Sequence, residues 1–99
     1  MAHIKVIELT EELCKEAQEL LQSPLGCSVI ILDLRRLRYI SSSTLLLMLE
    51  LRKLVQADNG AIILCSLNRN TVEMIRDTRI DTIFQIYANR HDALENYAA

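Results

Sequence analysis

The sequence predicts an α/β fold: a mixed, mostly parallel sheet of about four strands with four helices packed on it. Short apolar segments alternate along the chain with longer segments of helical periodicity, an order typical of parallel strands joined by helices. Two of the short segments are unbroken apolar runs rich in isoleucine, as expected for strands buried on both faces. Two glycines and one proline are too few for the many sharp turns of an all-β sandwich. A chain of 99 residues suits one domain, which is expected to span residues 1–99.

The first strand is expected over residues 4–9, which are rich in isoleucine and valine. Thr10 is followed by two glutamates and is predicted to be the N-cap of a first helix over residues 11–22. The second strand is predicted over residues 29–33 and ends in Asp33.

A second helix is expected from the Ser-Ser-Ser-Thr run to about Ala57, where Asp-Asn-Gly ends it. The third strand is predicted over residues 61–65, and Asn70 is predicted to cap a helix that runs to about residue 77. A fourth strand is expected over residues 82–87, and Asn89 is expected to cap the last helix. The inward side of that helix is predicted to carry Ala93, Leu94 and Tyr97.

Composition and charge exclude several classes of protein. The chain is 51% hydrophobic and 24% charged, which is typical of a folded domain, and its net charge of −2 provides no overall attraction for nucleic acid. The longest apolar runs, such as Leu45–Leu49, are far shorter than the roughly 20 residues of a membrane span. The first residues lack the apolar stretch of a signal peptide. We therefore expect a cytoplasmic protein with no nucleic-acid partner and no direct insertion into a membrane.

Neither a metal site nor a catalytic site is expected. Cys14, Cys27 and Cys65 have no spacing typical of zinc ligands, and Cys27 and Cys65 lie in or beside apolar strands, where cysteine packs as a small hydrophobe. His3 and His91 lie near the two ends of the chain, and the sequence contains neither a GxSxG turn nor a phosphate-binding glycine loop. We predict no enzyme activity, no catalytic residue, no metal and no cofactor.

The second helix is more apolar than one buried face requires. Its core stripe on a helical wheel consists of Leu47, Met48, Leu51, Leu54 and Val55. Leu45, Leu46 and Leu49 fall instead on the arc that carries the charged residues. Leu46 and Leu49 share a face with Lys53 there. Two interpretations remain open: loops bury the start of this helix on all sides, or these leucines form an exposed patch that binds a partner.

The Ser-Ser-Ser-Thr run of residues 41–44 stands where the second helix begins. One of its serines is expected to cap the helix, and a cap needs only one. A phosphate on another serine would lie at the positive end of the helix dipole, where it is favoured by about 0.3–1 kcal/mol. Beside exposed leucines, the same phosphate would disrupt the docking of a partner.

Three arginines, Arg35, Arg36 and Arg38, precede the serine run. They belong either to a solvated connection or to an anion site for acidic partner residues, nucleotide phosphates or lipid head groups.

Several stretches of the sequence match the pattern of one protein family. Residues 29–34 read VIILDL, a strand that ends in Asp, and residues 39–44 read YISSST. Residues 58–65 follow as a helix end and a strand, and residues 82–87 with residues 92–94 form the last strand and helix. This order resembles the STAS domain, the fold of sulphate transporters and anti-sigma-factor antagonists, and it implies a STAS-like α/β fold for this chain. The YISSST segment resembles the family's loop, which usually reads aromatic, hydrophobic, Asp, Ser, Ser or Thr, Gly.

The resemblance implies the function of the bacterial single-domain STAS regulators, which are anti-sigma-factor antagonists. The unphosphorylated regulator binds an anti-sigma factor that is also a serine kinase, and phosphorylation of the second Ser or Thr of the loop breaks the complex. By alignment with this loop the acceptor is Ser43, with Ser42 and Thr44 as secondary candidates. Ser41 stands where the family has Asp, and Thr44 stands where it has Gly.

The partner-binding surface that the resemblance implies combines the loop and the second helix. Its residues are Ser41, Ser42, Ser43, Thr44, Leu45, Leu46, Leu49 and Lys53. An alternative is a STAS subunit of a lipid-transport complex or signalling scaffold that works without phosphorylation, and the leucines also suit a homodimer. A third hypothesis, a small nucleotide-binding protein, requires binding near residues 35–38.

Overall fold

The structure is a computed structural model that describes residues 4–10, 29–57 and 59–98. The helix expected over residues 11–22 lies outside the described residues, as do Cys14 and Cys27 and the side chain of Tyr97.

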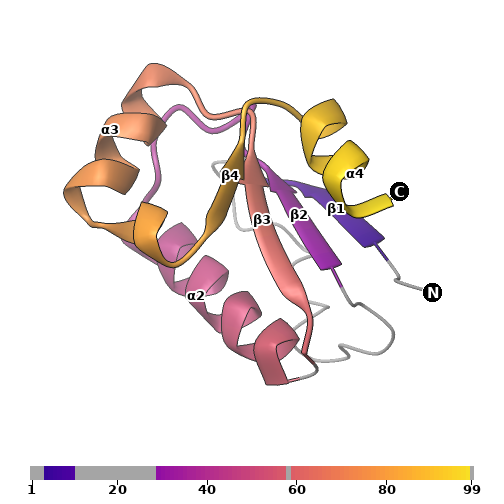
Figure 1. Cartoon of the computed structure of the whole chain (residues 1–99). Helices are drawn as coiled ribbons and strands as arrows, with labels where there is room; N and C mark the ends of the chain where they lie inside the picture. Colours follow the sequence, from indigo (N-terminus) through magenta and orange to yellow (C-terminus); the bar gives the residue numbers. More distant parts are fainter. Residues whose placement is uncertain (1–3, 11–28, 58, 99) are drawn as a thin grey trace.

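A parallel sheet of four strands organises the described chain (Figure 1). The strands are β1 (Ile4–Glu8), β2 (Val29–Asp33), β3 (Ala61–Cys65) and β4 (Gln85–Tyr87), and they lie side by side in chain order. Every neighbouring pair of described strands is parallel, where a mixed, mostly parallel sheet was expected. Parallel neighbours require a crossover between consecutive strands, and all strand carboxyl ends therefore meet at one edge of the sheet.

Helices cover both faces of this sheet. The helices α2 (Ser42–Ala57) and α3 (Arg69–Asp77) and the short 3-10 helix η1 (Ile80–Thr82) pack on one face, and α4 (Arg90–Ala98) packs on the other (Figure 1). The described residues form three α-helices where four were expected, because the range of the first expected helix lies outside them.

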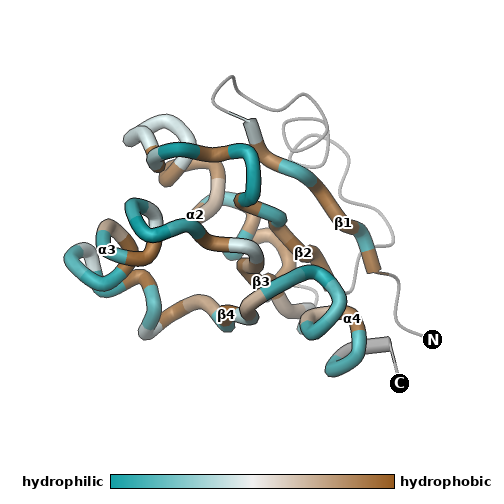
Figure 2. The backbone as a smooth tube through the Cα atoms, turned by 90° about the horizontal axis from the view of Figure 1, so that it is seen from above, coloured by the Kyte–Doolittle hydropathy of each residue, from teal (hydrophilic) through white to brown (hydrophobic). Residues whose placement is uncertain are grey.

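The inner strand β2 is buried from end to end and contributes to two apolar clusters. Ile30 and Leu32 pack under α2 and α3, whereas Val29 and Ile31 pack under α4. Figure 2 shows the resulting hydrophobic strands in the middle, between helices of mixed polarity. Each fully buried side chain of this kind contributes about 1.5–3 kcal/mol to the free energy of unfolding, so β2 anchors both layers.

Helix α2 buries one face against the sheet. Leu47, Met48, Leu51 and Val55 are buried as predicted, whereas Leu54 is only half-buried. The helix ends where Asn59 adopts the left-handed conformation, with φ of 57°, and the Gly60 N–H donates to the Val55 carbonyl at 2.6 Å. The Asn-Gly pair thus provides the expected end of the helix.

Two predicted elements differ from the structure. The N-cap of α3 is Asn68 rather than Asn70, because the Asn68 side chain accepts a hydrogen bond from the Thr71 N–H. The strand expected over residues 82–87 is shorter in the structure and consists of β4 (Gln85–Tyr87) alone. The chain before it forms η1, and the Phe84 N–H donates to the Ile80 carbonyl. The predicted cap of α4 is confirmed, since Asn89 Oδ1 accepts from the Asp92 N–H at 2.8 Å.

Candidate functional site

The hydroxyl groups at the start of α2 have different structural roles. Ser41 is the N-cap: its Oγ accepts from the Thr44 N–H at 3.1 Å, and its carbonyl accepts from the Leu45 N–H at 2.9 Å. The Ser41 hydroxyl also lies 3.0 Å from Thr44 Oγ1. Ser41 is therefore committed to holding the start of the helix.

The three candidate phosphoacceptors differ in accessibility. Ser42 and Ser43 are exposed in the first turn of α2, whereas Thr44 retains only 3% of its accessible surface. A kinase would have to open the helix to reach the Thr44 hydroxyl, but it needs no such opening for Ser43. The burial of Thr44 argues against it as an acceptor.

The leucines on the charged arc of α2 are not alike. Leu46 is 57% exposed, whereas Leu45 and Leu49 are half-buried and pack against the core. Lys53 is exposed. Both interpretations of the apolar helix start therefore hold in part: its flank is covered, and its outermost leucine faces solvent.

A hydrogen bond links α2 to the segment before β4. Arg52 Nε donates to the Ile83 carbonyl at 3.2 Å, which places Ile83 beside the flank of α2. The large hydrophobic side chains that the described residues expose are Tyr39, Leu46, Ile83 and Ile86. Leu46 and Ile83 thus come from the two elements joined by this bond.

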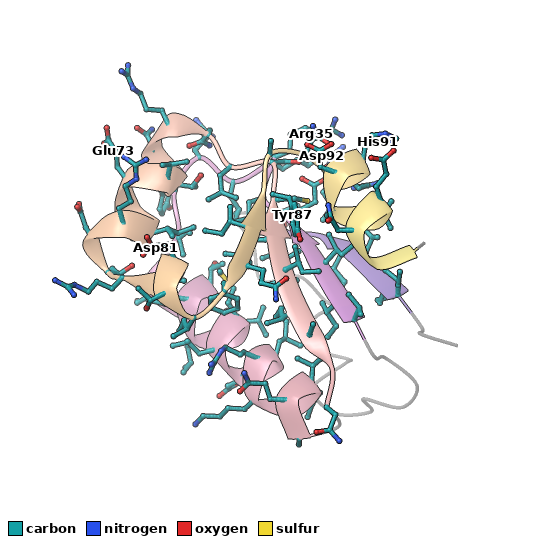
Figure 3. All side chains as sticks on the ribbon, viewed as in Figure 1. Arg35, Glu73, Asp81, Tyr87, His91 and Asp92 are labelled. Carbon is teal, nitrogen blue, oxygen red and sulfur yellow. The ribbon has the colours of Figure 1, made fainter. Side chains whose placement is uncertain are left out.

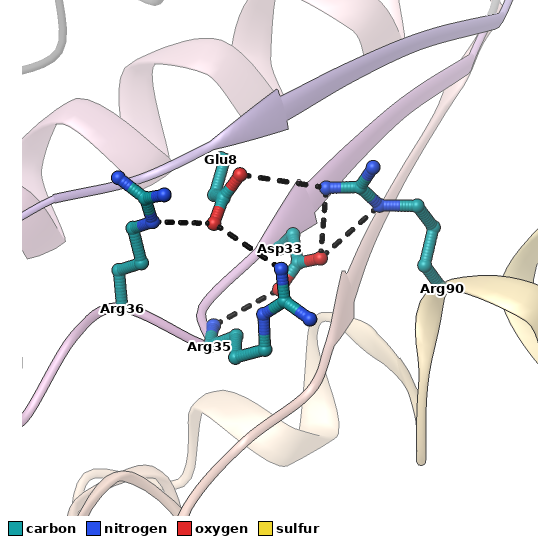
Figure 4. Close-up of polar contacts among 5 residues, drawn as sticks. All are labelled: Glu8, Asp33, Arg35, Arg36 and Arg90. Atoms are coloured by element: carbon teal, nitrogen blue, oxygen red, sulfur yellow. Dashed lines mark hydrogen bonds and ion pairs between the residues drawn. The ribbon is translucent and has the colours of Figure 1, made fainter.

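The predicted anion patch is paired with a carboxylate that the sequence analysis did not single out (Figure 4). Glu8, at the end of β1, has its Oε1 2.8 Å from Arg36 Nε and 3.7 Å from Arg35 Nη2. Arg38 is exposed on the same connection. The structure therefore brings Arg35 and Arg36 to one carboxylate.

A second carboxylate, Asp33 at the end of β2, is almost completely buried. Its Oδ2 lies 3.0 Å from Arg90 Nη2 and 3.1 Å from Arg90 Nε, and its Oδ1 accepts from the Arg35 N–H at 2.9 Å. Arg90 Nη2 is also 3.8 Å from Glu8 Oε2. The first residue of α4 is thereby joined to the ends of two strands.

These groups border a pocket of about 330 Å³ at the carboxyl edge of the sheet. The lining consists of Asp33, Arg35, Ser66, Asn89, Arg90 and His91. Arg35 and His91 lie together at this end of the molecule (Figure 3). The start of α2 lies at a different place, on the α3 side of the sheet (Figure 1), so the pocket and the serine run are separate features.

Cys65, the last residue of β3, is a free and buried thiol. Burial raises the pKa of this thiol, and a hydrogen bond with Ser66 opposes that effect. A thiol that stays protonated is a poor nucleophile. Cys65 is fully buried in the apolar cluster under α4, where it packs as a small hydrophobe as predicted.

Among the described residues, no group of three or more His, Cys, Asp and Glu side chains is arranged to hold a metal ion. No helix within the described ranges is both long and apolar enough to cross a bilayer.

Comparison with known proteins gives a consistent result. The family model of the STAS domain matches residues 2–93. The structure is similar to that of an anti-sigma-factor antagonist (STAS) domain protein from Planctomyces limnophilus, with a TM-score of 0.82 and 24% identity over 100% of this chain and 96% of that one. It is also similar to the NMR structure of the protein TM1081, with a TM-score of 0.80 and 22% identity over 93% of this chain and 79% of that one. No curated protein matches the sequence significantly.

Proposed function

Because the chain belongs to the STAS domain family, we propose that it is a regulatory module that binds an anti-sigma factor and is switched by phosphorylation of Ser43. The observation that carries the proposal is that the helix cap and the exposed candidate acceptor at the start of α2 are different serines. Ser41 caps the helix, so the exposed hydroxyl of Ser43 is available for modification without loss of the cap.

The first turn of α2 is a favourable place for a phosphate. Backbone N–H groups at the start of a helix carry partial positive charge, which stabilises an adjacent anion by about 0.3–1 kcal/mol. The described first turn of α2 contains no acidic side chain that would repel a phosphate. Phosphorylation of Ser43 is therefore compatible with the folded chain and adds up to two negative charges at neutral pH.

The proposed docking surface runs from the serines along the outer face of α2. Ser42, Leu46 and Lys53 are exposed and fall on one face of the helix. Leu45 and Leu49 extend this face toward the core. A partner that covers Leu46 would exclude water from the neighbouring first turn, so a phosphate there would have to be desolvated, and binding would weaken.

Binding of a kinase-type anti-sigma factor from the same organism tests this proposal. We expect Ser43→Ala to bind the partner as the unmodified chain does, and Ser43→Asp to bind at least about tenfold more weakly, because a charge desolvated at an interface costs more than 1.4 kcal/mol. Ser42→Asp is the matched control for a charge one residue away. Equal affinity of Ser43→Asp and Ser43→Ala would remove the switch from the proposal.

A constitutive role is the second candidate, as a STAS subunit of a lipid-transport complex or a signalling scaffold. Two observations favour it: Leu46 is exposed without any modification, and Thr44, which stands where the family loop usually has Gly, is buried and bonded to Ser41. Mass spectrometry of the tryptic peptide that covers residues 39–52, from chain purified from its source, separates the two candidates. A phosphate on Ser43 supports the switch, whereas a well-covered and unmodified peptide supports the constitutive subunit.

A further inference from the structure

We propose that the pocket at the carboxyl edge of the sheet binds the phosphate group of a small phosphomonoester. This site is separate from the docking surface on α2 and does not depend on the function proposed above. The pocket lies outside the carboxyl ends of the parallel strands, where the end of β2 and the segments that follow β2, β3 and β4 supply its lining residues.

The charged cluster at the pocket has a surplus of positive charge. The guanidinium groups of Arg35, Arg36 and Arg90 face the carboxylates of Glu8 and Asp33, so three positive charges meet two negative ones (Figure 4). At the pocket wall, His91 is paired with Glu95 at 3.0 Å. Among Arg35, Arg36, Arg90, Glu8 and Asp33, the guanidinium groups outnumber the carboxylates by one, and this surplus favours an anion as the ligand.

Arg35 is the cation that is most available to a ligand. Its side chain is 71% exposed, and its Nη2 is 3.7 Å from Glu8 Oε1, beyond the length of a direct hydrogen bond. The same Glu8 oxygen lies much closer to Arg36 Nε, at 2.8 Å. Because Glu8 keeps its shorter contact with Arg36, the carboxylate retains a counter-charge when the Arg35 guanidinium turns toward a phosphate.

Arg90 provides a fixed second guanidinium. Two of its nitrogens lie within 3.1 Å of Asp33 Oδ2, which determines the orientation of its planar group. Its side chain remains 42% exposed, so part of the group still faces the solvent beside the pocket. Arginine suits phosphate because its parallel N–H groups match two phosphate oxygens.

The carboxylate of Asp33 in the pocket lining does not make the pocket a binding site for a cation. It is the single carboxylate that the described residues contribute to the lining, and both of its oxygens already accept from Arg90 or from the Arg35 N–H. Divalent cations such as Mg²⁺ and Ca²⁺ require several oxygen ligands. The engaged carboxylate therefore serves to hold the Arg90 guanidinium and the backbone of Arg35 in place.

The size and the remaining lining fit a small ligand with hydroxyl groups. A volume of about 330 Å³ is at the lower end of ligand pockets in proteins. Ser66 and Asn89 add polar side chains to the wall. The pocket also borders the start of α4, where Asp92 in the first turn offsets the helix dipole, so the two arginines supply the attraction for an anion. A phosphate on a short polyol thus matches both the charge and the volume.

Nuclear magnetic resonance of the full chain labelled with 15N tests this proposal at constant ionic strength. The probes are glycerol 3-phosphate, inorganic phosphate and, as the uncharged control, glycerol. We expect glycerol 3-phosphate to shift the amide signals of Arg35, Ser66 and His91 in a saturable manner, and glycerol to leave them unchanged. Arg35→Gln should weaken the binding about tenfold, because a hydrogen bond to a charged group is lost.

Matched variants identify the site. Arg76→Gln removes the same charge from an exposed position on α3, across the sheet, and should leave the affinity unchanged. Ser43→Asp should also leave it unchanged, so failure of the proposed switch and failure of this site are distinguishable. The proposal is overturned if the shifts do not saturate, if Arg35→Gln and Arg76→Gln weaken binding equally, or if inorganic phosphate binds and glycerol 3-phosphate does not.

Discussion

Arg90 at the start of α4 grips the buried carboxylate of Asp33 at the end of β2, with two guanidinium nitrogens 3.0 and 3.1 Å from the same oxygen. The two residues are 57 positions apart in the sequence. Their ion pair links α4 to the inner strand β2, and both residues also line the pocket. One contact therefore serves the stability of the fold and the geometry of the proposed anion site.

The first prediction concerns this ion pair. Arg90→Gln should lower the free energy of unfolding by about 3 kcal/mol, because removing one partner leaves a buried carboxylate without its counter-charge. Urea denaturation followed by circular dichroism measures the change. The double variant Arg90→Gln/Asp33→Asn should recover part of the loss, because it no longer buries a charge. A loss below about 0.5 kcal/mol for Arg90→Gln would place the pair among ordinary surface ion pairs.

The second prediction separates the two structural roles in the serine run. Ser41→Ala should cost about 1 kcal/mol of stability, because the Thr44 N–H loses its acceptor at the helix start. Ser43→Ala should leave the unfolding midpoint nearly unchanged, because the Ser43 side chain is exposed. Thermal unfolding of both variants at the same pH measures the difference. An equal loss for both would mean that the cap is not confined to Ser41.

The sequence predicted the central strands well, and the reason is physical. The strands over residues 29–33 and 61–65 have the bounds that were expected. An unbroken run rich in Ile places apolar side chains on both faces of a strand, and both faces are then buried under helices. The expected strand over residues 82–87 begins three residues later. There, Ile83 and Phe84 have strand propensity, but the hydrogen bonds to the Ile80 carbonyl keep this segment in a turn.

The candidate site was only partly predictable. The helix wheel placed Leu46 on the charged arc of α2, and Leu46 is exposed there, because position on that arc is a property of one helix. The pairing of Asp33 with Arg90 depends on how α4 begins after the parallel strands, and no local pattern encodes it. The one signal was a carboxylate at the end of a buried strand, which requires a partner at the edge of the sheet.

The third prediction tests the outer face of α2. Leu46→Asp should change the free energy of unfolding by less than about 0.5 kcal/mol, because substitutions at exposed positions rarely matter. Leu51→Asp is the matched substitution on the buried face and should cost several kcal/mol, because it buries an unpaired charge. Leu49→Asp should fall between them, since Leu49 packs partly against the core. Urea denaturation of the three variants gives the order, and a large loss for Leu46→Asp would show that the leucine is covered.

The fourth prediction uses the raised pKa of the Cys65 thiol. Because burial disfavours the thiolate in the folded chain, the unfolded chain ionises first as the pH rises. The stabilising contribution of Cys65 is therefore fully present below the ordinary thiol pKa of about 8.5, and it is lost as the pH rises from there through the folded pKa. The stability difference between the unsubstituted chain and Cys65→Ala, measured with urea under reducing conditions, should stay constant from pH 6.5 to about pH 8 and shrink above about pH 9. A difference that grows at high pH would mean that the folded chain stabilises the thiolate, and Cys65 would then have to be considered as a reactive group beside the pocket.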